Sequence, residues 1–107
     1  MSVTDKDCDE ALDFLAEACD EIAAAKAELE RSEILRKRTR KKHFLAGSGT
    51  VAEREANAEM HEEAHLADDR YIAAIGAYEA LKAKRELRVI QIDVFRSQEA
   101  SRRQLKP

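Results

Sequence analysis

The sequence predicts an all-α protein, built as a long antiparallel helical hairpin of the coiled-coil type. Its 107 residues include only three glycines and one proline, at position 107, so the turns that a multi-stranded sheet needs are scarce. Charged residues make up 38% of the chain and aromatic residues only 5%, which argues against a large mixed core with a deep apolar pocket. We expect one domain over residues 1–107, with helices at about 5–45 and 51–102 and a turn at 46–50.

The first predicted helix carries a narrow apolar stripe. Its members recur at steps of three, four or seven residues, as in a coiled-coil seam: Leu12, Leu15, Cys19, Ile22 and Leu29. Basic residues crowd the last turns, where they complement the negative end of the helix dipole. The helix is expected to end before Gly47-Ser48-Gly49-Thr50, the only strong break in the pattern.

The second predicted helix has a clear start. Thr50 and Glu53 have the spacing of a capping box, in which the hydroxyl accepts from a free backbone N–H and the glutamate reaches back to the cap. From Met60 to Phe95, mostly apolar positions alternate steps of four and three. Residues 89–95 are rich in β-branched side chains, but no partner strand is available, so we expect them to be helical.

Neither predicted helix can bury its apolar stripe alone. The two are expected to pack against each other about the glycine turn, or against partner copies, and the sequence does not decide between a closed and a swapped hairpin. On this register, the chain beyond about Val94 overhangs. Because the core is thin, we expect a homo-oligomer.

The formal net charge of −3 conceals four blocks of alternating sign. Residues 1–30 carry −8, residues 31–46 carry +6, residues 47–69 carry −6 and residues 70–107 carry +5. In an antiparallel hairpin opposite signs meet twice, whereas a parallel pairing of two copies sets like against like. Each exposed pair contributes only about 0.2–1 kcal/mol, so the pattern is expected to set register and orientation more than stability.

Two basic groups are candidate surfaces for DNA or an acidic partner. The first is Arg36, Lys37, Arg38, Arg40, Lys41 and Lys42. The second lies in the C-terminal overhang and consists of Arg96, Arg102, Arg103 and Lys106. Such cations can neutralise phosphates, but without aromatic side chains for base stacking any DNA contact would be with the backbone. The alternatives are an interhelical or solvated charge run for the first group and a frayed end for the second.

Residues 61–65 match the zinc-binding pattern H-E-x-x-H. On a helix, His61 and His65 would share one face and could hold zinc, while the intervening glutamate could act as general base on bound water. A third ligand at a suitable spacing is missing, and a two-helix protein has no cleft to exclude water. We therefore expect a solvated helix face with no metal, and a zinc hydrolase stays only a remote alternative.

Other chemistry has no basis in the sequence. There is no glycine-rich phosphate cradle and no serine or cysteine with a base at a fixed spacing, so we expect no catalytic residue, no cofactor and no enzyme. Cys8 and Cys19 would lie about 16 Å apart along one helix, beyond disulfide reach, and their role stays open. No apolar run is long enough to span a membrane, and residues 1–8 lack the features of a secretory signal, so a cytoplasmic protein is expected.

The downstream half resembles a set of small helical proteins of tailed bacteriophages and prophages. The resemblance covers roughly residues 50–103 and rests on Glu53-Arg54-Glu55-Ala56-Asn57-Ala58, on the basic stretch 81–88, and on Phe95-Arg96-Ser97-Gln98-Glu99-Ala100-Ser101-Arg102-Arg103. The family typically reads E-R-E-A-x-A and W-R-S-x-E-A-x-x-R, so Phe95 stands where a tryptophan is usual. Its genes lie near those for DNA recombination and single-strand annealing, and it has no assigned catalytic activity.

These observations lead to two hypotheses of function. The first is a non-enzymatic phage-type accessory protein of DNA recombination or replication, which acts in the host cell cytoplasm through its basic helical surfaces on single- or double-stranded DNA or on a recombination or replication protein. The second is a coiled-coil adaptor or inhibitor that contacts only proteins. Both include self-association, and neither includes a membrane.

Overall fold

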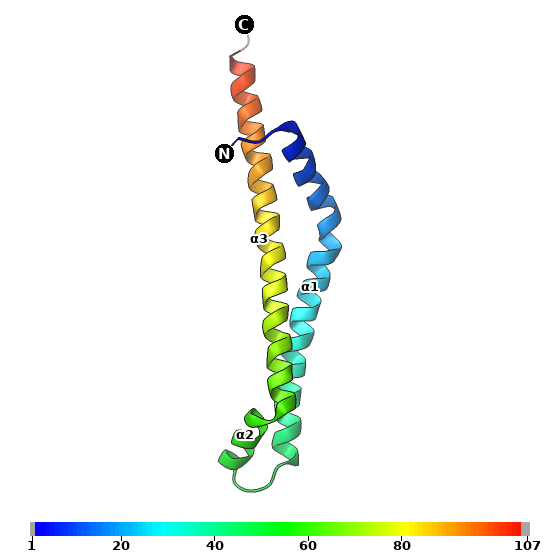
Figure 1. Cartoon of the computed structure of the whole chain (residues 1–107), viewed down its shortest axis with the longest axis vertical. Helices are drawn as coiled ribbons and strands as arrows, with labels where there is room; N and C mark the ends of the chain where they lie inside the picture. The colour runs from blue at the N-terminus through cyan, green and yellow to red at the C-terminus, as the bar shows by residue number, and fades with distance from the viewer. Residues whose placement is uncertain (1, 106–107) are drawn as a thin grey trace. The chain divides into compact units, whose positions relative to one another are not determined.

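The computed structural model describes residues 2–105, and within them the chain is built from three helices with no strand (Figure 1). Helix α1 spans Asp5–Ala46, α2 spans Val51–Met60 and α3 spans Glu62–Gln104. The prediction of an all-α protein is confirmed. No helix in this part of the chain is both long enough and apolar enough to cross a lipid bilayer.

Local signals set where the helices begin. At the start of α1, Thr4 Oγ1 accepts from the Asp7 N–H at 3.1 Å and the Asp7 carboxylate accepts from the Thr4 N–H at 3.0 Å, which is a complete capping box. These hydrogen bonds from Thr4 lower the pKa of Asp7. At the start of α2, Thr50 Oγ1 accepts from the Glu53 N–H at 3.2 Å, as predicted. Gly49, with φ of +100°, turns the chain immediately before this cap.

The predicted second helix is wrong in one respect, because it is interrupted at His61. This residue has φ −68° and ψ 139°, which is extended backbone, and it separates α2 from α3. Its carbonyl accepts from the Ala64 and His65 N–H groups at 3.0 and 3.2 Å, and its Nδ1 accepts from the Glu63 N–H at 3.1 Å. His61 therefore caps a new helix, because it satisfies N–H groups that a helix start leaves free.

Contacts divide the chain into two compact units. One consists of Met1–Ala23 with Glu79–Pro107, and the other is Ala24–Tyr78. In the first unit, a small apolar cluster is formed by Val3, Cys8, Ala11 and Ile92, with Leu15, Val94 and Phe95 packed against it. Cys8 is thus a buried thiol, whereas Cys19 is exposed.

The expected overhang beyond Val94 is shorter than the sequence predicted. The Gln98 side chain accepts from the Val3 N–H at 2.9 Å and donates to the Val3 carbonyl at 2.8 Å. These two bonds hold the segment before α1 against α3 four residues beyond Val94. The backbone N–H and carbonyl of Val3 lie outside a helix and need hydrogen-bond partners. The amide side chain of Gln98 provides an acceptor for the first and a donor for the second.

The buried positions are occupied mainly by small side chains. The stripe predicted from Met60 onward is largely confirmed, since Ala64, Ala67, Ala74 and Ile92 are buried, whereas the stripe predicted for the first helix is corrected. On α1, Ala11 and Ala18 are buried, and so are Ser32 and Thr39, each pair seven residues apart. The two hydroxyls donate to the carbonyls of Leu29 and Leu35 at 2.9 and 2.8 Å, so they are not left unsatisfied. Three members of the predicted stripes are instead exposed: Leu12, Cys19 and Met60. The reason is that helices approach closely where the facing side chains are small, which turns larger neighbours outward.

Candidate functional site

The six cations of the first basic group are of two kinds: some form ion pairs within residues 2–105, and the others do not. Arg36 Nε donates to Asp68 Oδ1 at 2.9 Å. The two terminal nitrogens of Arg40 donate to the two oxygens of the same carboxylate at 2.8 and 2.7 Å. The hydrogen bonds from Arg40, and secondarily from Arg36, hold the pKa of Asp68 at about 2. The same interaction raises the pKa of Arg40. These two arginines therefore join α1 to α3 within the Ala24–Tyr78 unit.

Two further cations of this group are paired as well. Lys37 lies 3.2 Å from Glu33 one turn earlier on α1, and Lys42 Nζ lies 3.2 Å from Glu63 Oε2 on α3. Arg38 and Lys41 are exposed and contact no carboxylate within residues 2–105. Of the six predicted residues, the structure leaves these two for a partner outside the chain.

A further ion pair between α1 and α3, between Glu28 and Arg70, was not predicted. Arg70 Nε and Nη2 donate to the two oxygens of Glu28 at 2.7 and 3.2 Å. This contact lowers the pKa of Glu28 and raises that of Arg70. The alternating charge blocks indicate that such pairs exist, but the choice of partners depends on which helix faces meet.

The C-terminal basic group is more open. Arg96 and Arg103 are exposed and line a shallow pocket together with Phe95, Glu99 and Ala100. Arg102 lies 2.9 Å from Glu99 on the same helix. Lys106 lies outside the described residues. An exposed pocket lined by two arginines and an aromatic side chain is a surface that an acidic group can contact.

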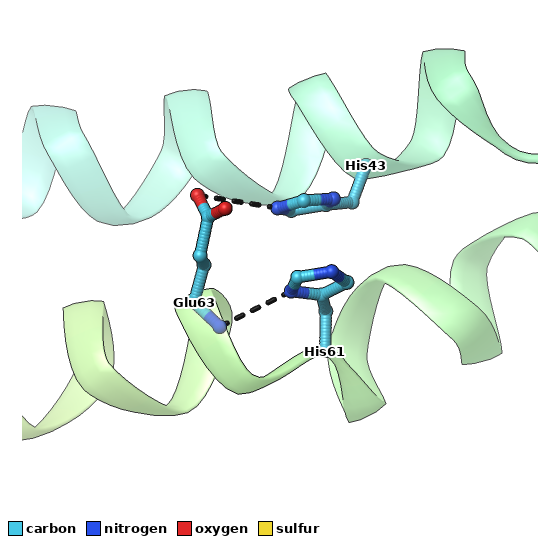
Figure 2. Close-up of side chains that lie close together, drawn as sticks. All are labelled: His43, His61 and Glu63. Carbon is cyan, nitrogen blue, oxygen red and sulfur yellow. Dashed lines mark hydrogen bonds and ion pairs between the residues drawn. The ribbon is translucent and has the colours of Figure 1, made fainter.

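In the H-E-x-x-H segment the two histidines do not lie on the one continuous helix that the sequence predicted. His61 lies between two helices, and its ring turns back to the Glu63 N–H; His65 lies on α3 and is exposed. The partner of His61 is instead His43, near the end of α1. Their rings are stacked, with centroids 3.5 Å apart and an angle of 15° between the planes (Figure 2). Eighteen residues separate the two histidines, so only the tertiary contact brings them together.

Glu63 completes a cluster with the two histidines. His43 Nε2 lies 3.4 Å from Glu63 Oε2, and one ligand atom from each of the three residues lies within 4.8 Å of the others. The hydrogen bond from Lys42, and secondarily the nearby His43 ring, lower the pKa of Glu63, so its carboxylate is ionised near neutral pH. Two imidazoles and a carboxylate are the kind of donor set that holds a transition-metal ion.

Large apolar side chains gather on the outside of both units. At least twelve such residues are exposed: Leu12, Ile34, Leu35, Leu45, Val51, Met60, Leu66, Ile72, Leu87, Val89, Ile90 and Leu105. In the Ala24–Tyr78 unit, Leu66 and Ile72 on α3 have 61% and 64% of their surface exposed. Leu66 also lines a groove with Leu35, Thr39, Glu63, Ala67 and Arg70. Exposed apolar side chains contribute to association where they lie together in one contiguous patch.

The fold and these surfaces define an all-helical protein with a small-residue core and apolar side chains turned outward. Comparisons with protein-family models, with curated proteins and with solved structures find no match.

Proposed function

We propose that the protein is a non-enzymatic interaction module, an antiparallel helical hairpin that associates with a second copy of itself. The observation that carries the proposal is that small side chains fill most buried positions, while many large apolar side chains are exposed. The buried set consists largely of Ala, Ser and Thr, together with Val3, Cys8 and Ile92, whereas many of the leucines, isoleucines and valines are exposed. Burying one such large side chain contributes about 1.5–3 kcal/mol, so a second copy that covers several of them adds substantially to a weak core.

The contacts between α1 and α3 support the antiparallel arrangement. In the Ala24–Tyr78 unit, the partner's number falls as the α1 number rises: Glu28 with Arg70, Arg40 with Asp68, and Lys42 with Glu63. In the other unit, Val3 is bonded to Gln98, and the Lys84 ammonium lies 4.7 Å from the centre of the Phe14 ring. The opposing order follows from the charge blocks, because it sets acids against bases.

The groove beside Leu66 supports a second copy as the occupant. It is lined by the apolar side chains of Leu35, Leu66 and Ala67, with Thr39, Glu63 and Arg70 beside them. Glu63 and Arg70 are already paired within the chain, with Lys42 and Glu28, so the apolar side chains are the part that a second copy can cover. A two-fold contact sets this apolar surface against itself.

Sedimentation velocity over a hundredfold range of concentration tests the association. We expect the wild-type chain to sediment as an oligomer that dissociates on dilution, and Leu66→Lys to dissociate at least tenfold more readily. Ala73→Lys is the matched control, because Ala73 is also exposed on α3 but does not line the groove. Helical circular dichroism verifies that both variants are folded. A wild-type monomer at every concentration, or equal weakening by both variants, would contradict the proposal.

A second candidate function, contact with DNA as a phage-type accessory protein of recombination or replication, has its own observation in favour. Arg38, Lys41, Arg96 and Arg103 are exposed and form no ion pair within the described part of the chain. This hypothesis, and with it a cytoplasmic location, agrees with the resemblance of the downstream half to phage helical proteins.

Fluorescence anisotropy with single- and double-stranded DNA across a salt series tests the DNA hypothesis. If Arg38 and Lys41 contact phosphates, the double variant R38Q/K41Q lowers the slope of log K against log salt by about 1.4–1.8. The control is Lys37→Gln, since Lys37 is occupied by Glu33. Absence of binding at low salt removes a direct role on DNA and leaves the protein-interaction function.

A further inference from the structure

The cluster of His43, His61 and Glu63 combines residues from three different elements. His43 lies near the end of α1, His61 lies between α2 and α3, and Glu63 lies in the first turn of α3. Figure 2 shows that each ring presents a nitrogen to the side on which Glu63 lies. One ligand atom of each residue lies within 4.8 Å of the other two, so small side-chain movements suffice to bring all three to one ion.

The inner nitrogen of His43 is an independent indication of a ligand. The side chain of His43 is only 14% exposed, and its Nε2 is buried without a hydrogen-bond partner. The Glu63 carboxylate lies 3.4 Å away, within ion-pair distance but outside hydrogen-bond geometry. A buried polar atom without a partner is unfavourable, and coordination of a cation by its lone pair supplies the missing partner.

We propose that His43, His61 and Glu63 form a binding site for a divalent transition-metal ion, for which Zn²⁺ is the best match. Imidazole nitrogens together with one carboxylate oxygen are ligands that zinc accepts, and three protein ligands leave a position for water. The bound ion ties the end of α1 to the junction between α2 and α3. The site differs from the H-E-x-x-H pattern, because its third ligand comes from α1 and His65 takes no part.

Binding requires the stacked rings to separate. An imidazole lone pair lies in the plane of its ring, so two nearly parallel rings cannot both point at one ion. Rotation about the side-chain bonds of His43 and His61 opens the stack and brings each nitrogen to about 2.0–2.1 Å from the metal. His61 either gives up the hydrogen bond from the Glu63 N–H or coordinates through its other nitrogen. Because His61 is outside both helices, its side chain can turn without breaking a helix.

Zinc titration of the full chain tests the proposal, with isothermal calorimetry for affinity and circular dichroism for thermal unfolding. We expect one ion per chain and, at a Zn²⁺ concentration a hundredfold above Kd, a rise in the unfolding midpoint of roughly 10 °C. His43→Ala and His61→Ala should each weaken binding at least tenfold. His65→Ala is the matched control and should change Kd less than twofold.

The outcomes separate the proposed site from its alternatives. Each variant is compared with its own metal-free form, so a change in fold stability is not mistaken for a loss of zinc binding. If His43→Ala does not fold, His43→Gln is used in its place. Loss of binding in His65→Ala together with His61→Ala, while His43→Ala binds normally, would assign the ion to the H-E-x-x-H pair and overturn the proposal. Absence of zinc binding, or equal binding by all variants, would overturn it as well. Glu63 also lines the groove beside Leu66, so zinc binding is measured at one fixed protein concentration for the wild type and for Leu66→Lys, and normal binding by Leu66→Lys separates the metal site from self-association.

Discussion

Replacement of Asp68 by asparagine removes the carboxylate that holds both Arg36 and Arg40. The side chain keeps its shape but loses its charge, and the bidentate contact of Arg40, at 2.8 and 2.7 Å, is lost with it. The pKa of Asp68 lies at about 2, below the ordinary 3.8, which corresponds to at most about 2.4 kcal/mol of stability. Because 26% of the side chain is exposed and Arg36 is at the surface, solvent screening reduces the expected loss to about 1 kcal/mol.

The contribution of Asp68 has a defined pH dependence. Its pKa is lower in the folded chain than in the unfolded chain, so the unfolded state binds a proton first as the pH falls. The stabilisation is complete above about pH 5, declines as the pH falls through 3.8 toward 2, and is nearly gone at pH 2. The difference between the wild type and Asp68→Asn should follow the same course.

Urea and thermal unfolding, followed by circular dichroism at a fixed protein concentration, measure both effects. At pH 7, the unfolding midpoint of Asp68→Asn should lie about 4–5 °C below that of the wild type. Asp69→Asn is the control, because Asp69 is exposed and forms no ion pair in the described chain. Equal stability of the two variants at pH 7, or a difference that persists undiminished at pH 2, would refute the reasoning.

The same unfolding assay checks three further predictions. Gly49→Ala should lower the free energy of unfolding by about 1 kcal/mol or more, because φ is +100° and the added carbon would meet the Glu53 carboxylate. Gly76→Ala should instead raise the free energy of unfolding by up to about 1 kcal/mol, because the space around this position in α3 is open. A stabilising Gly49→Ala together with a destabilising Gly76→Ala would contradict the assigned backbone. Thr50→Ala should cost about 1 kcal/mol through loss of the cap on α2, and a neutral effect would show that the cap contributes nothing. Ala64→Leu should cost about 1–3 kcal/mol, because Ala64 is fully buried, whereas Ala73→Leu at an exposed position should have little effect; equal effects would place the helix seam elsewhere.

The residues of the candidate metal site could not be predicted from the sequence. The H-E-x-x-H pattern draws attention to His61 and His65, on the assumption of one continuous helix through both. The chain breaks at His61, the ring turns toward Glu63, and the second imidazole comes from α1. A cap at His61 is hard to predict because histidine is not among the preferred capping residues, and no local pattern points to His43.

The sequence predicted which charged segments meet, but not which residues form ion pairs. The four blocks of alternating sign indicate that bases of the 31–46 segment meet acids of the 47–69 segment, as Arg40 does with Asp68. The sequence could not show that Arg36 and Arg40 share one carboxylate while Arg38 and Lys41 stay free. That choice depends on which side of α1 faces α3, and charges occur on several sides of the helix.

By itself, the sequence determined the helical class and most helix ends, because scarce glycine and proline, the capping threonines and the Gly47–Gly49 segment act locally on the backbone. The spacing from Met60 also placed Ala64, Ala67, Ala74 and Ile92 on the buried face of α3, whereas only the tertiary structure decided which face of α1 is buried. Alanine occupies many positions around α1 and is compatible with either a buried or an exposed site, so the apolar pattern there does not select a single stripe. Close approach of the backbones then places Ala, Ser and Thr inside and turns leucines such as Leu12 and Leu66 outward. The exposed apolar surface, and the meeting of His43 with His61, are consequences of that packing.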